Sequence, residues 1–148
     1  WLAHHHHQDM ERAAQAGLLH DLAKYFPPDK LLNLAQSAGV EITAVEEADP
    51  HLLHADVSAI VARQEFGVND PEVLGAIRNH TLGMPGMSLL SGVVFLADSL
   101  EPGRGNNPEL EAIRQVAQQD LYQAIVLVCD RTLHHLIEHR RLIPPRMV

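Results

Sequence analysis

The sequence predicts an all-α fold, a bundle of helices with little or no β-sheet. Apolar residues recur at spacings of three and four along most of the 148 residues, as they do on the buried face of a helix. Residues that begin or end helices lie between these segments, such as Asp or Asn before Pro, and Gly after an apolar run. The alternation of apolar and polar residues that is typical of strands is scarce.

Helices are expected in the first half of the chain over residues 10–25, 31–38 and 50–66. Asp9 can cap the first of these, and Pro27 stops it, because proline lacks the amide hydrogen that a helix interior needs. The other two end at Gly39 and Gly67, since glycine readily adopts the conformation that closes a helix. The acidic stretch 40–50 between them is expected to be a loop.

Further helices are expected over residues 72–80 and 89–98, from residue 108 onward, and over residues 120–140. Their starts are marked by Asp70 and Asn107, each followed by proline, and by Ser88 as a cap. Segments 81–87 and 101–107 are rich in turn residues and are expected to connect the helices. No internal repeat is evident.

Composition favours one domain, residues 1–148, because this length with 46% apolar residues supports a single core. The net charge of −8 opposes attraction to a phosphate polymer, so nucleic acid is not expected as a partner. The single cysteine, Cys129, excludes an internal disulfide, and we expect it to pack as a small apolar group. No apolar stretch approaches the ~20 residues that span a bilayer, so a cytoplasmic protein is expected.

The pair His20-Asp21 is the strongest candidate for chemistry, because it interrupts an otherwise apolar run over residues 16–23. A buried polar pair needs partners, and a bound cation can supply one. Asp98 raises the same expectation, since it ends the run of small and apolar residues 92–97.

Two further histidines, His54 and His80, lie near the ends of other expected helices. The five candidate metal ligands are therefore His20, Asp21, His54, His80 and Asp98. Ligands from different helices are typical of metal sites inside helical bundles, and imidazole with carboxylate suits iron, manganese, cobalt, nickel or zinc. One or two ions could be held, and a water between two ions is acidified enough to attack phosphorus. The set predicts a metal-dependent phosphohydrolase.

The remaining histidines are expected at the surface. They are His4 to His7, read as a solvated helix end or turn, and His51, His134, His135 and His139.

These candidates stand in longer motifs, which are Ala16–Lys24 (AGLLHDLAK), Leu53-His54, Ala76–Gly83 (AIRNHTLG), Gly86–Ser88 and Ala97–Arg104 (ADSLEPGR). On these motifs the chain resembles the HD-domain superfamily, and more closely the bacterial YqeK-like group of symmetrical diadenosine tetraphosphate hydrolases. The resemblance covers residues 13–144. The Glu-Pro-x-Arg sequence after the Ala-Asp pair is its narrower marker.

The resemblance implies an all-helical HD fold and the cleavage of a dinucleoside tetraphosphate into two nucleoside diphosphates, with iron as the native ion. It implies metal ligation by His20, Asp21 and Asp98, and a second metal site or phosphate contacts at His54 and His80. It also implies phosphate binding by Lys24 and Arg104, which with Asp21 form the expected catalytic set. Lys24 is expected one helical turn after His20 on the same face, and a guanidinium can bind phosphate oxygens bidentately.

The family pattern also has a metal-binding histidine on a helix well before the His20-Asp21 pair. By spacing this histidine falls before Trp1, so the N-terminal helix is expected to be incomplete. Two alternatives stay open: an HD phosphohydrolase of another nucleotide, such as a monophosphate, a deoxynucleotide or a cyclic nucleotide, and a catalytically silent nucleotide-binding regulator. A homodimer is compatible with each of them. Base selectivity and the number of ions are left open.

Overall fold

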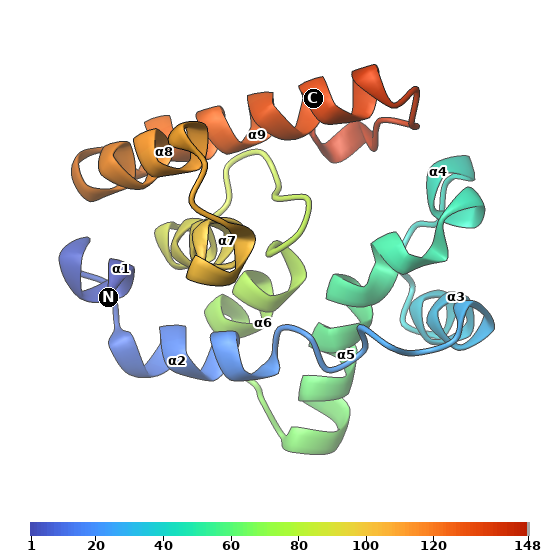
Figure 1. Cartoon of the computed structure of the whole chain (residues 1–148). Helices are drawn as coiled ribbons and strands as arrows, with labels where there is room; N and C mark the ends of the chain where they lie inside the picture. Colours follow the sequence, from blue (N-terminus) through green and yellow to red (C-terminus); the bar gives the residue numbers. More distant parts are fainter. Residues whose placement is uncertain (148) are drawn as a thin grey trace.

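Helices and turns make up residues 1–147, the part of the chain that the computed structural model describes (Figure 1). No β-strand occurs in that range, so the predicted all-helical fold is confirmed. The α-helices are α1 (Leu2–His5), α2 (Met10–Leu19), α3 (Pro28–Ser37), α4 (Ala44–Ala48), α5 (His54–Phe66), α6 (Pro71–Arg78), α7 (Leu89–Leu100), α8 (Pro108–Gln119) and α9 (Leu121–Glu138). Short 3-10 turns are η1 (Pro50–Leu53), η2 (Pro102–Arg104) and η3 (Pro145–Met147).

Caps predicted from the sequence are present at most of these helix starts. The side chains of Asp9, Asp70, Ser88 and Asn107 accept hydrogen bonds from amides in the first turns of α2, α6, α7 and α8. These bonds satisfy amides that have no partner inside the helix. Local chemistry therefore sets where these helices begin.

The helix expected over 10–25 is shorter than predicted, because α2 ends at Leu19 and residues 20–25 form turns. In this segment amides bond to carbonyls three residues earlier, as from Lys24 to Asp21 at 3.1 Å. The amide of Ala23 instead donates to the buried hydroxyl of Ser58 in α5, at 3.0 Å. This tertiary bond takes the place of a helical one, and the expectation that Lys24 follows His20 on one helix face is wrong.

The stretch 40–50, expected to be a loop, contains the short helix α4. Thr43 and Glu46 form a capping box at its start, in which the Thr43 amide donates to Glu46 Oε2 at 2.9 Å. The Thr-x-x-Glu signature was present in the sequence and predicts this helix start. At the N-terminus, His4 and His5 end α1 and His6 and His7 form the turn after it, as expected for a helix end or turn. His6 Nε2 also contacts the Ala117 carbonyl of α8 at 2.6 Å.

Helix α7 runs through the middle of the molecule, with α9 on one side and α2 and α6 on the other (Figure 1). It is buried along most of its length and joins two apolar clusters, one with α8 and α9 and one with α2, α5 and α6. A third cluster lies between α3, α5 and the turn at Ala23. A Cβ at Gly92 would lie 2.9 Å from Ile125 Cδ1, so glycine here allows α7 to approach α9 closely.

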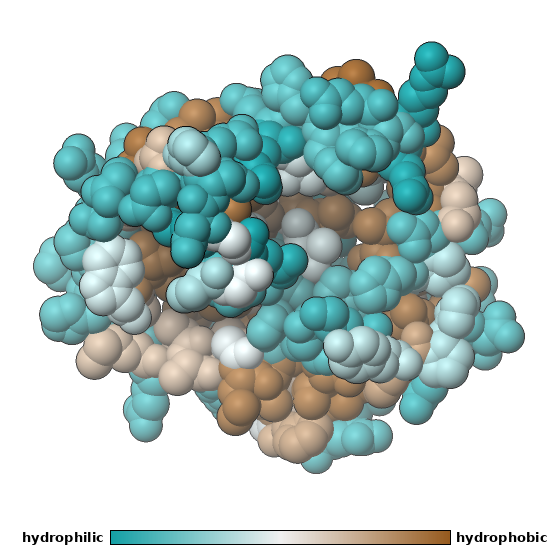
Figure 2. Space-filling view, viewed as in Figure 1, coloured by the Kyte–Doolittle hydropathy of each residue, from teal (hydrophilic) through white to brown (hydrophobic). Residues whose placement is uncertain are grey.

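The face in Figure 2 is mostly hydrophilic, with apolar residues gathered toward its lower edge and in its recesses. Among residues 1–147, no helix combines the length and the apolar character needed to cross a lipid bilayer.

Candidate metal and phosphate site

Three histidines meet where the ends of different helices converge. His20 directly follows α2, His54 begins α5, and His80 lies in the turn after α6. Each ring places Nδ1 against a backbone carbonyl three residues earlier, at 2.5 Å from Gly17, 2.8 Å from His51 and 2.7 Å from Ile77. A carbonyl only accepts hydrogen bonds, so each Nδ1 carries a proton and each Nε2 is left to face the site.

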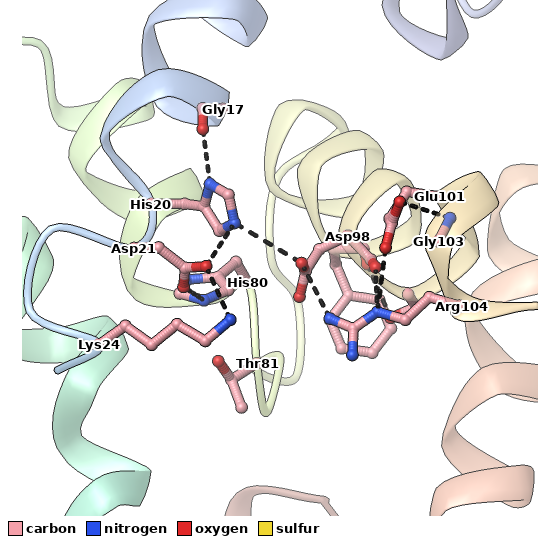
Figure 3. A network of polar contacts seen from close by, with 12 residues as sticks. Gly17, His20, Asp21, Lys24, His80, Thr81, Asp98, Glu101, Gly103 and Arg104 are labelled. Carbon is pink, nitrogen blue, oxygen red and sulfur yellow. Dashed lines mark hydrogen bonds and ion pairs between the residues drawn. The ribbon is translucent and has the colours of Figure 1, made fainter.

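The carboxylate of Asp21 lies at the centre of these three rings. Its Oδ1 is 3.5 Å from the Nε2 atoms of both His54 and His80, and its Oδ2 is 3.3 Å from His20 Nε2. The two oxygens therefore face different histidines (Figure 3). Such a carboxylate can serve one ion or bridge two.

Asp98 reaches the same site from α7. Its Oδ1 lies 3.5 Å from His20 Nε2 and 3.2 Å from Arg104 Nη2, and its backbone oxygen accepts a hydrogen bond from Arg104 Nε at 3.0 Å. All five residues predicted from the sequence as metal ligands are thus in one continuous network, although they come from four separate parts of the chain.

The charge states in this network favour a cation. Burial lowers the pKa of both His54 and His80, so these rings are neutral near pH 7. The hydrogen bond to Asp98 is the largest cause that raises the pKa of His20. Burial raises the pKa of Asp98, but the hydrogen bond from His20 and the charge of Arg104 outweigh it, so that the pKa is lowered overall. The site therefore combines two neutral imidazoles, those of His54 and His80, with the ionised carboxylate of Asp98.

This donor set fits a divalent transition ion. One ligand atom each from His20, Asp21 and His80 lie within 4.8 Å of one another. The Nε2 atoms of His54 and His80 are only 3.1 Å apart, and with both Nδ1 atoms protonated neither neutral ring can donate to the other. A cation beside both lone pairs removes this conflict. Histidines oriented by Nδ1 bonds to carbonyls are also typical of metal ligands.

Two cationic side chains flank the cluster on opposite sides (Figure 3). Lys24 Nζ lies 3.3 Å from Asp21 Oδ2, and Arg104 lies beside Asp98 as described. Their side chains are 40% and 48% exposed, so both can reach a bound anion. The arrangement can hold a polyphosphate between a metal centre and two positive charges.

Sequence reasoning missed Thr81 and Ser58. Thr81 Oγ1 lies 3.4 Å from His54 Nε2 and can donate a hydrogen bond to its lone pair. The Ser58 hydroxyl accepts a hydrogen bond from the Ala23 amide and so fixes the turn that carries Asp21 and Lys24. Thr81 directly follows His80 in the motif Ala76–Gly83, and its position there is a sequence signal for a site residue. Nothing in the sequence distinguishes Ser58 from other serines in helices, and its role is visible only from its contact with the distant Ala23 amide.

The other histidines that we expected at the surface are exposed, namely His51, His134, His135 and His139. His51 stacks on the ring of His54, with centroids 4.7 Å apart. Burial raises the pKa of the Cys129 thiol, in agreement with its expected role as a packing residue.

Comparison with known proteins gives concordant matches. A model of the HD domain family matches residues 1–103. The chain is 34% identical over 137 residues to a symmetrical bis(5'-nucleosyl)-tetraphosphatase from Bacillus subtilis, covering 93% of this chain and 73% of the relative. It is 36% identical to the enzyme of the same name from Halalkalibacterium halodurans, covering 93% and 72%. A crystal structure from Clostridium acetobutylicum, described as a "predicted HD superfamily hydrolase involved in NAD metabolism", superposes with a TM-score of 0.94 at 34% identity, covering 99% of this chain and 77% of that one.

Proposed function

This chain belongs to the HD domain family and is a hydrolase, and on that premise we propose that it cleaves diadenosine tetraphosphate symmetrically into two ADP. The expectation of an HD fold is confirmed by the same matches. The main support for this proposal is that the five candidate metal ligands lie together between two exposed cations, Lys24 and Arg104. The five ligands are His20, Asp21, His54, His80 and Asp98. Two relatives that cover most of this chain bear the name of this activity.

The five acidic and histidine side chains would hold one or two divalent transition ions, and we propose iron as the native ion, with manganese, cobalt or nickel able to replace it. Such ions, when bound, acidify water for attack on phosphorus and offset the charge of phosphate oxygens. The choice of iron rests on the resemblance to the family, whereas nitrogen and oxygen donors suit each of these ions.

The chain's own residues then bind and orient the tetraphosphate. Lys24 and Arg104 contact phosphate oxygens, Arg104 through two N–H groups of its planar fork. In the reaction a water oxygen forms a bond to one inner phosphorus atom and gives up its protons. The bond from that phosphorus to the central bridging oxygen breaks, and this oxygen leaves with the other half, so that both products are ADP. Charge that develops on this leaving group is stabilised by the same cations, and this electrostatic effect is the main contribution of the protein.

We further propose that residues 1–148 act as one HD-type domain, that the enzyme works in the cytoplasm, and that it can form a homodimer. The reducing cytoplasm suits a chain with a single cysteine, and it contains the nucleotide substrate class. Neither nucleic acid nor a membrane is part of the proposal, which is consistent with the net charge of −8.

The test is an anaerobic assay of diadenosine tetraphosphate with Fe²⁺, Mn²⁺ or Co²⁺, with product analysis by anion-exchange chromatography. ADP as the sole nucleotide product supports the proposal, whereas ATP with AMP would contradict symmetrical cleavage. A panel of nucleoside monophosphates, deoxynucleotides and cyclic nucleotides should react much more slowly. Preferred turnover of any of these would reassign the substrate, and bound metal without turnover of any of them would favour a silent regulator.

A further inference from the structure

Arg114 in α8 makes most of its hydrogen bonds to one loop, the segment 100–106 that begins at the last residue of α7. Its Nη1 also lies 3.5 Å from Glu111 Oε2 in its own helix. Its guanidinium donates to the backbone oxygens of Leu100 at 2.9 Å, Glu101 at 3.3 Å and Gly105 at 2.8 Å, and to Asn106 Oδ1 at 3.4 Å. The side chain is only 18% exposed, unlike most arginines at a surface.

Apart from Arg114, the contacts of this loop are made by its own residues. Leu100 and Glu101 are at the end of α7, where carbonyl groups lose their helical partners. Within the segment, the amides of Arg104 and Gly105 donate to carbonyls three residues earlier, at 2.9 and 3.2 Å. The Gly103 amide also donates to Glu101 Oε2 at 2.7 Å, and Arg104 itself links the loop to Asp98 of α7. Arg114 adds four charge-assisted hydrogen bonds from α8, which are stronger than the neutral ones, so it is the main link between the loop and α8.

This loop carries Arg104. Arg104 is about half exposed, and from the loop its Nε and Nη2 donate to the backbone oxygen and Oδ1 of Asp98. A displacement of the backbone at residue 104 would move the guanidinium away from Asp98 and from any phosphate beside it. Positioning errors of this kind strongly reduce the efficiency of an active site.

We propose that Arg114 is a positioning residue, which holds segment 100–106 so that Arg104 is preorganised beside Asp98 for the substrate's phosphates. This inference rests on the proposed function of Arg104. The planar guanidinium is essential to this role, because it donates to four acceptors of the loop that lie in different directions. A lysine ammonium at the same place is a single point of charge and cannot replace the set.

The test compares Arg114→Ala and Arg114→Lys with Arg104→Ala and with the double variant Arg104→Ala/Arg114→Ala. Arg131→Ala is the matched control, because Arg131 is another arginine that contacts α8, through Glu109 at 2.9 Å, and it has no bond to the loop. We expect both Arg114 variants to lower kcat/KM about ten- to hundredfold, chiefly through KM, while bound metal is unchanged. In the Arg104→Ala background the further loss should be less than about twofold, since coupled residues are not additive.

If Arg114 had a purely structural role, Arg114→Ala would lower kcat/KM by the same factor with and without Arg104. It would also lower the fraction of folded protein. Either that result, or activity of Arg114→Lys equal to that of Arg131→Ala, would overturn the inference.

Hydrogen exchange separates this inference from the proposed function. In Arg114→Ala the amides of residues 103–106 should exchange faster than in wild type, and those of α7 should not. If the wild-type chain hydrolyses no nucleotide, the proposed function fails, yet this measurement still decides whether Arg114 holds the loop. Unchanged exchange at these amides would refute the inference whatever the activity.

Discussion

The Nε2 atoms of His54 and His80 face each other at 3.1 Å, and the Nδ1 atom of each ring is hydrogen-bonded to a backbone carbonyl. Burial lowers the pKa of both rings, so a proton shared between them is disfavoured. Asp21 Oδ1 lies 3.5 Å from each of these nitrogens. Two lone pairs and a carboxylate at this separation are compatible when a cation lies among them.

Removal of metal should therefore destabilise the fold. A cation that binds only the native state contributes about 2.7 kcal/mol at a free concentration of 100 times its Kd. We expect chelation with EDTA to lower Tm by about 5–10 °C and added Mn²⁺ to restore it, as measured by differential scanning calorimetry. His80→Ala is the control, since its Tm should not respond to either treatment. Equal Tm values for chelated and Mn²⁺-loaded wild-type protein would contradict the metal site.

Replacement of Asp98 by Asn should abolish both metal retention and turnover. Asn has nearly the same shape and can still accept a hydrogen bond from Arg104, but it lacks the negative charge. We expect metal affinity to fall by about 100-fold or more, because anionic oxygen donors contribute strongly to ion binding. Metal content by plasma mass spectrometry and turnover would be compared with those of Asp130→Asn, an exposed carboxylate on α9. Wild-type values in Asp98→Asn would remove this residue from the site.

Arg104→Ala should affect substrate rather than metal. Loss of a hydrogen-bonded charge on phosphate costs about 1.5–3 kcal/mol, which corresponds to a roughly 10- to 150-fold rise in KM for the tetraphosphate. Metal content should equal that of wild type and of Arg131→Ala. Unchanged steady-state kinetics in Arg104→Ala would show that it does not contact the substrate.

The ion pair of Arg146 with Asp56 should make stability depend on pH in a defined direction. Asp56 is buried in α5, and Arg146 Nη2 lies 3.4 Å from its Oδ2. Burial raises the pKa of Asp56 and Arg146 opposes this rise, so Arg146→Ala should raise the pKa further. Ionised Asp56 then destabilises the fold at neutral pH, by about 1–2 kcal/mol relative to wild type, and protonation relieves this cost as the pH falls.

Urea unfolding at about pH 7 and about pH 5 would measure that difference, which should shrink at the lower pH. The double variant Asp56→Asn/Arg146→Ala, compared with Asp56→Asn, should show little difference at either pH. A deficit in Arg146→Ala that is constant over this range would show that Asp56 is not its cause.

Local signals in the sequence predicted most helix starts, since a cap acts within one turn of the residue that supplies it. The same locality explains the error at residues 20–25. The apolar pattern there predicts that the helix continues. Instead the Ala23 amide donates to the hydroxyl of Ser58, 35 positions away, and the chain forms turns. The short helix α4 was not predicted for a different reason. Its Thr-x-x-Glu capping signature is a local signal in the sequence, but the acidic stretch was interpreted as a loop.

By itself the sequence determined the chemistry available to this protein: an all-helical chain with imidazoles and carboxylates set into apolar runs, next to a lysine and an arginine. Residue type and neighbouring apolar character are local properties, so they can be read along the chain. Tertiary structure alone decided that Asp21 turns its two oxygens toward different histidines, that each histidine presents Nε2, and that Arg114 holds the loop of Arg104. These depend on distances between segments far apart in the chain, which are set by how the helices pack and not by any single stretch of residues.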